Sequence, residues 1–227
     1  MTSKNHNRKP VRKYRVILVD DHPMVRERLA QLIKTQHDLI TCGEADSLVS
    51  AMDLVARQKP DIAIVDLSLK KSSGLDLIKE LTARYPTVRV LVLSMYEESL
   101  YAERTLRAGA RGYLTKQEAT DKIIEAIHVI LEGQIYLNTR MSRVMLATFV
   151  DGARTRIEDL VGGLTDRELQ VFELVAAGLN NQSIGRQMGI DHRTVETYRT
   201  RIKQKLAINN SKELLQYAME WRMKQST

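Results

Sequence analysis

The sequence has few of the residues that stabilise secreted or membrane proteins. Cys42 is the single cysteine, which excludes a disulfide within the chain and a cysteine-based zinc site. No apolar run approaches the ~20 residues needed to cross a bilayer. The first fifteen residues are basic and contain no acid, but the apolar segment of a signal peptide does not accompany them. We therefore expect a cytoplasmic protein without a membrane partner, in which residues 1–14 form a basic disordered tail.

The remaining composition is that of an ordinary globular protein. Of the 227 residues, 43% are hydrophobic and 28% are charged, which is enough for one large domain or two small ones. Lysines and arginines number 35 against 28 acids, so the net charge is +7. Such an excess favours a polyanionic partner, although charge alone does not identify one.

Apolar strand segments alternate with segments of helical spacing in the first half of the chain. The stretch Asp61–Leu67 is rich in β-branched residues, as expected of a strand buried on both faces of a parallel sheet. Five such strands alternating with five helices predict an α/β fold, a doubly wound parallel sheet with right-handed crossovers. The expected strands are 16–19, 39–42, 61–67, 88–93 and 113–116, and the expected helices are 25–33, 48–57, 75–84, 97–108 and 118–131.

Polar residues stand at the carboxyl ends of four of these strands, namely Asp20, Asp21, Asp66, Ser94 and Lys116. Alone, each has an ordinary explanation as a turn carboxylate, a capping serine or a solvated lysine. A parallel sheet, however, brings these strand ends to one crevice. Three clustered carboxylates would form an oxygen-rich pocket that suits Mg²⁺, while the lysine and the serine suit the oxygens of a phosphoryl group. Asp66 is then the expected nucleophile.

These residues resemble the receiver domains of two-component response regulators, and the resemblance covers residues 15–134. It implies that a sensor histidine kinase transfers a phosphoryl group to Asp66. It also implies that Mg²⁺ is held by Asp20, Asp21 and Asp66, together with the backbone carbonyl of Ser68.

The same resemblance implies a switch. Tyr113 would change rotamer when Ser94 is drawn to the phosphoryl group, although a tyrosine at this position can also be a simply packed side chain. One departure concerns the loop after Asp66. Many members carry a proline four residues after the aspartate, whereas this sequence has Lys70-Lys71, which leaves the conformation of the loop open.

The alternating pattern stops after Gly133. Residues 135–163 are predicted to be a linker with one helix, Arg140–Phe149, and residues 164–227 a small all-α domain. Within that domain a short helix, Asn181–Met188, precedes a tight turn and a longer helix, His192–Leu206. This arrangement is typical of a helix-turn-helix.

The longer helix is apolar on one side and basic on the other. Val195, Ile202 and Leu206 share a face at helical spacing and should be buried. The opposite side resembles a helix that lies in a DNA major groove, although a basic surface helix without a partner fits equally well. We expect its threonines to reach base edges and its lysines to meet phosphates. The predicted DNA-contacting residues are Arg193, Glu196, Thr197, Thr200, Arg201, Lys203, Gln204 and Lys205.

The chain resembles the LuxR-type DNA-binding domain over residues 164–219. The resemblance is carried by Leu164–Glu168, Ala177–Asn181 and Thr194–Tyr198 with Lys205-Leu206. A receiver followed by this domain is similar to the NarL/FixJ class of transcription regulators. The resemblance implies a regulator that binds double-stranded DNA as a homodimer, promoted by phosphorylation, and RNA polymerase is a further candidate partner. The implied dimer contacts on the last helix are Leu214, Leu215 and Ala218.

Two residues depart from the LuxR-type pattern. Gly185 stands where an alanine is usual, and a glycine inside a helix is expected to cost about 1 kcal/mol of stability. Tyr198 replaces a frequent histidine, and the sequence does not indicate the effect.

Two other functions stay open at this stage. One is an enzyme that works through an aspartyl-phosphate, such as a phosphatase of the haloacid dehalogenase type. Such enzymes use a second aspartate two residues after the nucleophile, where this chain has Ser68, and they would leave the helix-turn-helix unexplained. The other is a DNA-binding regulator that is independent of phosphorylation, against which the intact acidic set with Lys116 argues. We expect a regulator rather than an enzyme.

Overall fold

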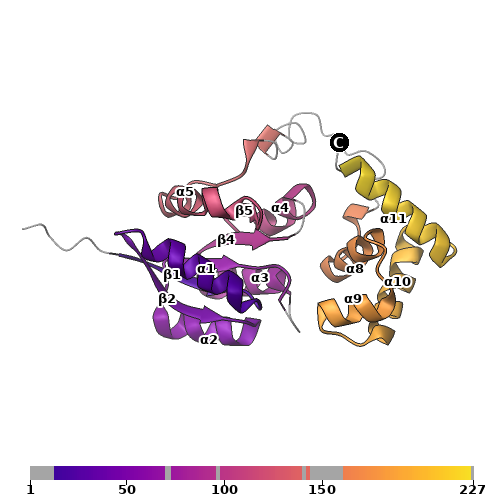
Figure 1. Cartoon of the computed structure of the whole chain (residues 1–227), viewed down its shortest axis with the longest axis horizontal. Coiled ribbons are helices and arrows are strands. Elements are labelled where there is room, and N and C mark those ends of the chain that lie inside the picture. The colour runs from indigo at the N-terminus through magenta and orange to yellow at the C-terminus, as the bar shows by residue number, and fades with distance from the viewer. Residues whose placement is uncertain (1–12, 70–72, 96–97, 140–141, 144–160, 226–227) are drawn as a thin grey trace, which may run out of the picture.

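The computed structural model describes residues 13–69, 73–95, 98–139, 142–143 and 161–225. Three sequence expectations lie outside these residues: most of the basic tail, the Lys70-Lys71 loop and nearly all of the predicted linker helix. The described residues form an α/β part and a following helical part (Figure 1). None of the described helices is both long enough and apolar enough to span a membrane.

The α/β part is built on a five-stranded sheet in the order β2-β1-β3-β4-β5, in which every pairing is parallel. The predicted doubly wound parallel sheet is therefore confirmed. The pairing of β2 with β1 extends to Ala45, so β2 is longer than the sequence pattern predicted. The strands are β1 (Tyr14–Val19), β2 (Leu39–Ala45), β3 (Ile62–Val65), β4 (Arg89–Ser94) and β5 (Gly112–Thr115).

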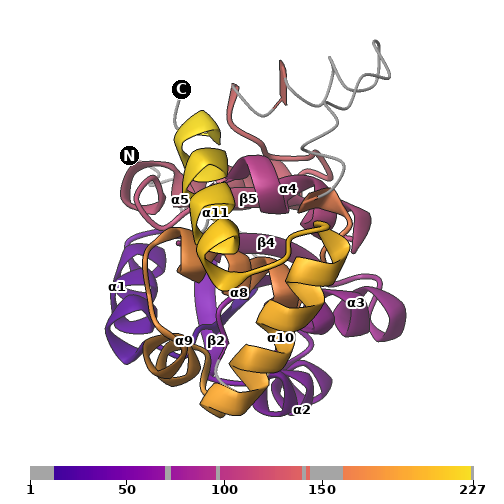
Figure 2. The ribbon, with the colours of Figure 1, turned by 90° about the vertical axis from the view of Figure 1, so that its right-hand side faces the viewer.

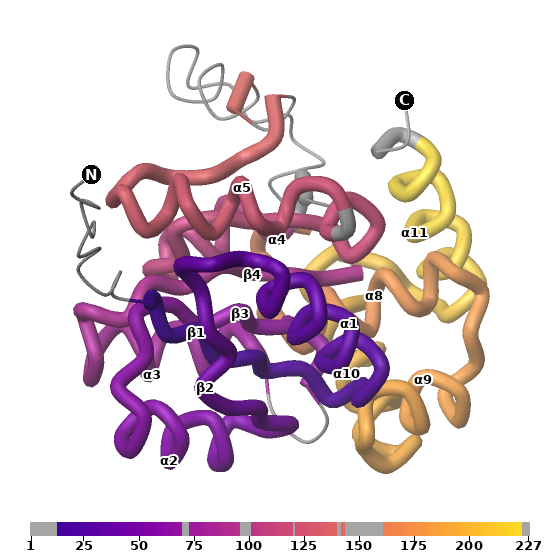
Figure 3. The backbone as a smooth tube through the Cα atoms, turned by 60° about the vertical axis from the view of Figure 1, so that its left-hand side comes forward, coloured from indigo at the N-terminus to yellow at the C-terminus, as the bar shows by residue number. Residues whose placement is uncertain are grey.

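Helices cover both faces of this sheet (Figure 3). Alternate residues of each strand point to opposite faces, so Ile17 and Val65 pack with α2 and α3, while Leu18 and Ile64 pack with α1 and α5. The two apolar layers bury β3 completely and most of its neighbours β1 and β4. The helices are α1 (Pro23–Lys34), α2 (Leu48–Gln58), α3 (Gly74–Arg84), α4 (Glu98–Arg107) and α5 (Ala119–Leu131).

The helical part packs around a small aromatic core. The ring of Phe172 lies 5.2 Å from that of Trp221 in an edge-on arrangement and 6.2 Å from that of Tyr217. Its described helices are α8 (Asp166–Ala176), α9 (Asn181–Met188), α10 (His192–Lys205) and α11 (Ser211–Gln225). The predicted capping box begins α8, because Thr165 caps the amide of Glu168 and the Glu168 carboxylate accepts from the amide of Thr165.

The two parts meet through α4 and α8. Arg104 of α4 donates to the carboxylate of Asp166 at 3.1 Å and to the carbonyl of Leu164 at 2.8 Å. The helical part turns α8 toward the α/β part, while α10 and α11 lie on its outer side (Figures 1 and 2). The helix expected to read DNA is therefore not covered by the sheet domain.

Candidate functional site

Strand register brings the predicted acidic residues together. Val19 of β1 is paired with Val65 of β3, so the residues that follow, Asp20 and Asp66, are neighbours at the same sheet edge. Their backbones continue the ladder, since the amide of Asp66 donates to the carbonyl of Val19 at 2.8 Å. Asp20 is 3% exposed and Asp66 is 2% exposed. The sheet thus presents two carboxylates in a nearly closed pocket.

Lys116 joins these two carboxylates. Its ammonium lies 2.7 Å from Asp20 Oδ2 and 2.7 Å from Asp66 Oδ2. Burial opposes the charge on Lys116, but the attraction of Asp66 and the bonds to both aspartates raise the pKa of this lysine overall. Burial also opposes the charge on Asp66 and therefore raises the pKa of this carboxyl group. The charge of Lys116 counteracts part of that rise. The positive charge of the lysine therefore offsets the repulsion between the two neighbouring carboxylates, Asp20 and Asp66.

His22 is a member of the pocket that the sequence reasoning did not identify. Its Nδ1 lies 2.8 Å from Asp21 Oδ1 and 3.1 Å from Asp20 Oδ1. Ligand atoms of Asp20, Asp21, His22 and Asp66 all lie within 4.8 Å of one another, so the four could surround a metal ion. The signal was available, because His22 directly follows the two acids in the turn that begins α1.

Ser68 and Gly74 both lie close to Asp66. The amide of Ser68 donates to Asp66 Oδ1 at 3.2 Å, which fixes one carboxylate oxygen. Gly74, the first residue of α3, approaches the backbone so closely that a Cβ there would lie 2.1 Å from the carbonyl oxygen of Asp66. A glycine is required at this position because any side chain would collide with the strand that carries Asp66.

The ends of β4 and β5 complete the crevice. Ser94 and Tyr113 are both fully buried, and the amide of Lys116 donates to the carbonyl of Ser94 at 2.8 Å. The structure therefore gathers Asp20, Asp21, Asp66, Ser94 and Lys116 at one edge of the sheet, as their strand positions predicted. Tyr113 packs in the core beside this edge, and its change of rotamer stays a prediction.

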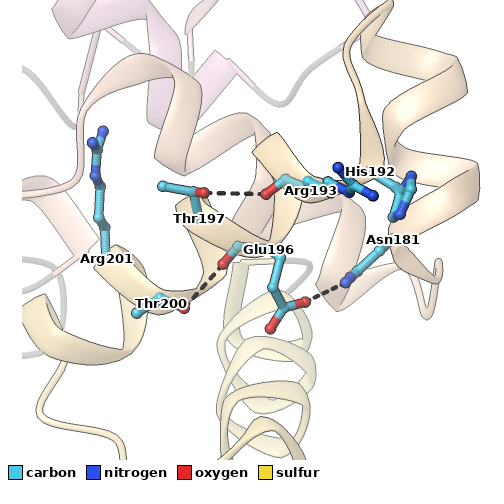
Figure 4. Close-up of a pocket in the computed structure, with 7 residues that line it drawn as sticks. All are labelled: Asn181, His192, Arg193, Glu196, Thr197, Thr200 and Arg201. Atoms are coloured by element: carbon cyan, nitrogen blue, oxygen red, sulfur yellow. Dashed lines mark hydrogen bonds between the residues drawn. The ribbon is translucent and has the colours of Figure 1, made fainter.

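The second site is the outer side of α10 (Figure 4). Val195 and Ile202 are fully buried, as predicted, and the opposite side of the helix is exposed. A hollow on this side is lined by residues of α10 and by Asn181, the first residue of α9. The lining residues are Asn181, His192, Arg193, Glu196, Thr197, Thr200 and Arg201. Five of the eight predicted DNA-contacting residues thus line one surface.

Lys205 departs from the expected role. Its ammonium lies 2.7 Å from the buried carboxylate of Glu168 and 3.3 Å from the carbonyl of Gly163, so it is held at the start of α8. The expectation that Lys205, flanking the groove-facing side of α10, meets a phosphate is therefore revised, because its ammonium already pairs with Glu168. Lys203 is half-buried and Gln204 is exposed, and neither lines the hollow.

The predicted dimer contacts on α11 also need correction. Leu214 and Ala218 are fully buried, where with Trp221 they face α8 of the same chain and its aromatic core. Side chains enclosed in this way cannot also form a surface contact between subunits. Leu215 is half-buried, while Met219 and Met223 of the same helix are exposed.

The two departures from the LuxR-type pattern have local consequences. A Cβ at Gly185 would lie 2.8 Å from the carbonyl oxygen of Ile190, in the turn between α9 and α10. The glycine therefore permits a close approach of backbone, and the expected gain from alanine does not apply at this position. Tyr198 is half-buried against the helical core.

Comparison with known proteins supports both halves. Residues 16–128 match the model of the response regulator receiver domain, and residues 163–218 match that of the bacterial regulatory proteins of the luxR family. The chain is 30% identical over 210 residues to the oxygen regulatory protein NreC of Staphylococcus carnosus, covering 91% of this chain and 97% of that protein.

Further relatives have the same two-part organisation. The transcriptional regulatory protein YxjL of Bacillus subtilis is 30% identical over 208 residues, covering 91% of this chain and 95% of that protein. RcsB of Salmonella enterica serovar Typhimurium, solved bound to a promoter in the presence of phosphomimetic BeF3-, has the same fold with a TM-score of 0.61 at 22% identity, covering 91% and 98% of the two chains. This chain belongs to the two-component response regulators with a LuxR-type DNA-binding domain, a family of transcription regulators rather than enzymes.

Proposed function

We propose that the chain regulates transcription by binding DNA under the control of phosphorylation at Asp66. The observation that carries this proposal is the buried carboxylate of Asp66, which lies 2.7 Å from Lys116 and belongs to one cluster with Asp20 and Asp21. Each of these groups has a use in phosphoryl transfer. A structural ion pair alone would not require a third carboxylate, that of Asp21, beside the two that Lys116 joins.

The acidic cluster fits a divalent ion. Carboxylate oxygens from Asp20, Asp21 and Asp66 are hard ligands of the kind that Mg²⁺ prefers, and the carbonyl of Ser68 would supply another oxygen. When bound, Mg²⁺ would neutralise negative charge on these carboxylates and on the incoming phosphoryl oxygens. We assign Asp20, Asp21, Asp66 and the Ser68 carbonyl as its ligands.

The transfer follows from the chemistry of Asp66. One of its carboxylate oxygens attacks the phosphorus of a phosphohistidine on the partner kinase, a P–O bond forms and the P–N bond breaks. The electron pair of the broken bond stays on the imidazole nitrogen. Lys116 then has a phosphoryl oxygen to pair with in place of the free carboxylate, and the hydroxyl of Ser94 supplies a neutral hydrogen-bond donor.

The output is proposed to be double-stranded DNA. The outer side of α10 is exposed, carries Arg193 and Arg201 and lines a hollow with short polar side chains. We propose that two phosphorylated chains bind together, so that two copies of α10 occupy successive major grooves. Phosphorylation would then act by promoting the homodimer.

Labelling with acetyl phosphate and Mg²⁺ tests the first step. One phosphoryl group, stable in acid and labile in base, should appear on the wild-type chain and should be absent from Asp66→Asn, because an amide is not a nucleophile. Asp76→Asn is a matched control, since Asp76 is an exposed aspartate on α3. Equal labelling of the Asp66 variant would show that the site assignment is wrong.

The second step is tested by DNA binding. Phosphorylated and unphosphorylated chain should be titrated against genomic fragments by footprinting, with Asp66→Asn in parallel. The wild-type chain should gain affinity on phosphorylation and the variant should not. A wild-type chain that binds equally well in both states would favour the phosphorylation-independent regulator instead.

A further inference from the structure

The hollow on α10 contains a carboxylate in a place where a DNA-binding helix usually carries donors. Glu196 lies about one turn into α10, in the half of a recognition helix that meets base edges. Its neighbours in the hollow are Arg193, Thr197 and Thr200 (Figure 4). A negative charge close to phosphates is unfavourable, so this glutamate requires an explanation.

A chain of hydrogen bonds holds the glutamate in position. Arg199 Nη1 donates to Asn181 Oδ1 at 3.0 Å, and Asn181 Nδ2 donates to Glu196 Oε2. Because the amide oxygen of Asn181 accepts from the guanidinium, its NH₂ group must face Glu196. The carboxylate is therefore tied to α9 through one oxygen, and Oε1 takes no part in this chain of bonds.

The two threonines nearby have already used their hydroxyl protons. Thr197 Oγ1 donates to the carbonyl of Arg193 at 3.1 Å, and Thr200 Oγ1 donates to the carbonyl of Glu196 at 3.0 Å. Each side chain therefore offers its methyl group and an oxygen that accepts. Together with Glu196, they make the middle of this surface a set of acceptors and methyl groups without a donor of its own.

Such a surface selects among bases. In the major groove, cytosine presents the N4 amino group as a donor, whereas guanine and thymine present oxygen acceptors that would repel a carboxylate. Adenine presents a donor beside the N7 acceptor, which also repels a carboxylate. We propose that Glu196 reads a cytosine in each half-site, and that Asn181 is the positioning residue that aims it. This inference rests on the proposed DNA-binding function.

The surroundings make the charge tolerable. Arg193 and Arg201 line the same hollow and add positive charge near the carboxylate. Arg199 donates a hydrogen bond to the side-chain oxygen of Asn181. A base that offers a donor satisfies Oε1 of the desolvated carboxylate, while a wrong base leaves only the bond from Asn181 to Oε2. The discrimination is therefore produced largely by the penalty for the wrong base.

In vitro selection with the phosphorylated full-length chain tests this assignment. Randomised duplexes should yield a half-site with one cytosine whose replacement by any other base weakens binding roughly 5- to 150-fold. Glu196→Gln should shift the preference at that position from cytosine to adenine, because a glutamine can donate to N7 and accept from N6. The other positions should keep their preferences.

Asn181→Ala tests the positioning role. This variant should still prefer cytosine but discriminate less, because the carboxylate is no longer fixed. Gln187→Ala removes an exposed side-chain amide from the same helix and should leave the profile unchanged. Circular dichroism would verify that each variant is folded.

The outcomes separate this inference from the function on which it rests. If the wild-type chain shows no sequence preference on any duplex, the proposed function fails and the inference fails with it. If the chain selects a site but Glu196→Gln has the wild-type base profile, only the reading by Glu196 is overturned. A folded Glu196→Gln that binds no duplex also counts against it, because glutamine is well suited to contact bases.

Discussion

The phenol of Tyr101 donates a hydrogen bond of 2.9 Å to the carboxylate of Glu173, and so ties α4 of the receiver to α8 of the DNA-binding domain. Tyr101 is 2% exposed and Glu173 is half-buried, so the contact is partly shielded from water. Because α4 follows β4, whose last residue is Ser94, and contacts α8 through Tyr101, this helix lies between the proposed phosphoacceptor site and the second domain.

Arg104 should contribute most of the stability of the contact between the two domains. Its guanidinium donates to the carbonyls of Leu164 and Gly162 at 2.8 and 2.9 Å and to the carboxylate of Asp166 at 3.1 Å. Bonds of this charged type contribute about 1.5–3 kcal/mol each. We expect Arg104→Ala to separate the domains and increase the radius of gyration measured by small-angle scattering.

The matched control is Arg107→Ala, which removes the same charge from the same helix. Arg107 is exposed and pairs with Glu103 within α4, so its loss should leave the scattering curve unchanged. Identical curves for the two variants would show that the Arg104 contacts do not hold the domains together.

Lys116 should be essential for the stability of the receiver when Mg²⁺ is absent. Its removal leaves Asp20 and Asp66 buried beside each other without a counter-charge, which typically costs about 3–5 kcal/mol. Urea unfolding of Lys116→Ala should show this loss at neutral pH, and added Mg²⁺ should recover part of it. Lys122→Ala, which breaks a more exposed pair with Glu118, should have a far smaller effect, because water already screens that pair.

The pH dependence of this variant has a defined sign. Burial already raises the pKa of Asp66, and loss of Lys116 removes the attraction that opposes that rise. The folded state then binds the proton more tightly than the unfolded state, so its stability should increase as the pH falls through the raised pKa. A variant whose stability deficit is constant between neutral and mildly acidic pH would contradict the charge assignment.

Much of the receiver could be predicted from the sequence because its signals are local and repeated. Each buried strand is an apolar run, and the parallel arrangement alone brings Asp20, Asp66, Ser94 and Lys116 to one edge. No knowledge of side-chain contacts was needed for that step. The capping box of α8 could also be predicted, because its two partners, Thr165 and Glu168, are only three positions apart in the sequence.

What the sequence could not predict depends on neighbours that are remote in the chain. Lys205 looked like a groove-facing cation until the fold placed it beside Glu168, 37 residues earlier. Ala218 and Leu214 looked like contacts between subunits, but α8 covers them in the same chain. Asn181 gave no signal, because its role arises only when α9 brings it against Glu196.

Gly185 provides a test in which two physical effects predict opposite signs. Helix propensity favours alanine over glycine by about 1 kcal/mol. The structure, however, places a new Cβ 2.8 Å from the carbonyl oxygen of Ile190, and overpacking of this kind costs typically about 1–3 kcal/mol. We expect Gly185→Ala to lower the free energy of unfolding of the helical domain, while the exposed Gln187→Ala has little effect. Stabilisation by the alanine would mean that the turn between α9 and α10 relaxes easily.

The arrangement on DNA can be measured directly. If two copies of α10 enter successive major grooves on one side of the duplex, the half-sites should lie about 10 bp apart, roughly 34–36 Å. Footprints of the phosphorylated chain on duplexes with spacings from 5 to about 15 bp would locate the optimum. Full-affinity protection of a lone half-site by a monomer would contradict the proposed homodimer.

Lys203 should contribute to DNA binding, whereas Lys205 should contribute to the stability of the helical domain. Lys203 flanks the groove-facing side of α10 and is expected to meet a phosphate, so Lys203→Ala should weaken specific and random DNA alike and reduce the salt slope by about one. Lys205 is held by the Glu168 carboxylate at 2.7 Å, so Lys205→Ala should leave the salt slope nearly unchanged and instead destabilise the helical domain by roughly 1–3 kcal/mol.

The stability effect should also depend on pH in a particular window. Burial raises the pKa of Glu168, but its bonds to Lys205 and Thr165 lower the pKa overall, below the ordinary 4.5. A carboxyl group with a lowered folded-state pKa contributes stability that is present above 4.5 and is lost as the pH falls through the folded-state pKa. The gap in stability between wild type and Lys205→Ala should therefore be widest near neutral pH and shrink as the pH falls below 4.5 toward the lowered folded-state pKa. The roles of the two lysines can be measured by titrating cognate and random duplexes over a range of salt concentrations and by denaturant unfolding of Lys203→Ala and Lys205→Ala. A lower salt slope for Lys205→Ala with unchanged stability would show that Lys205 belongs to the DNA interface.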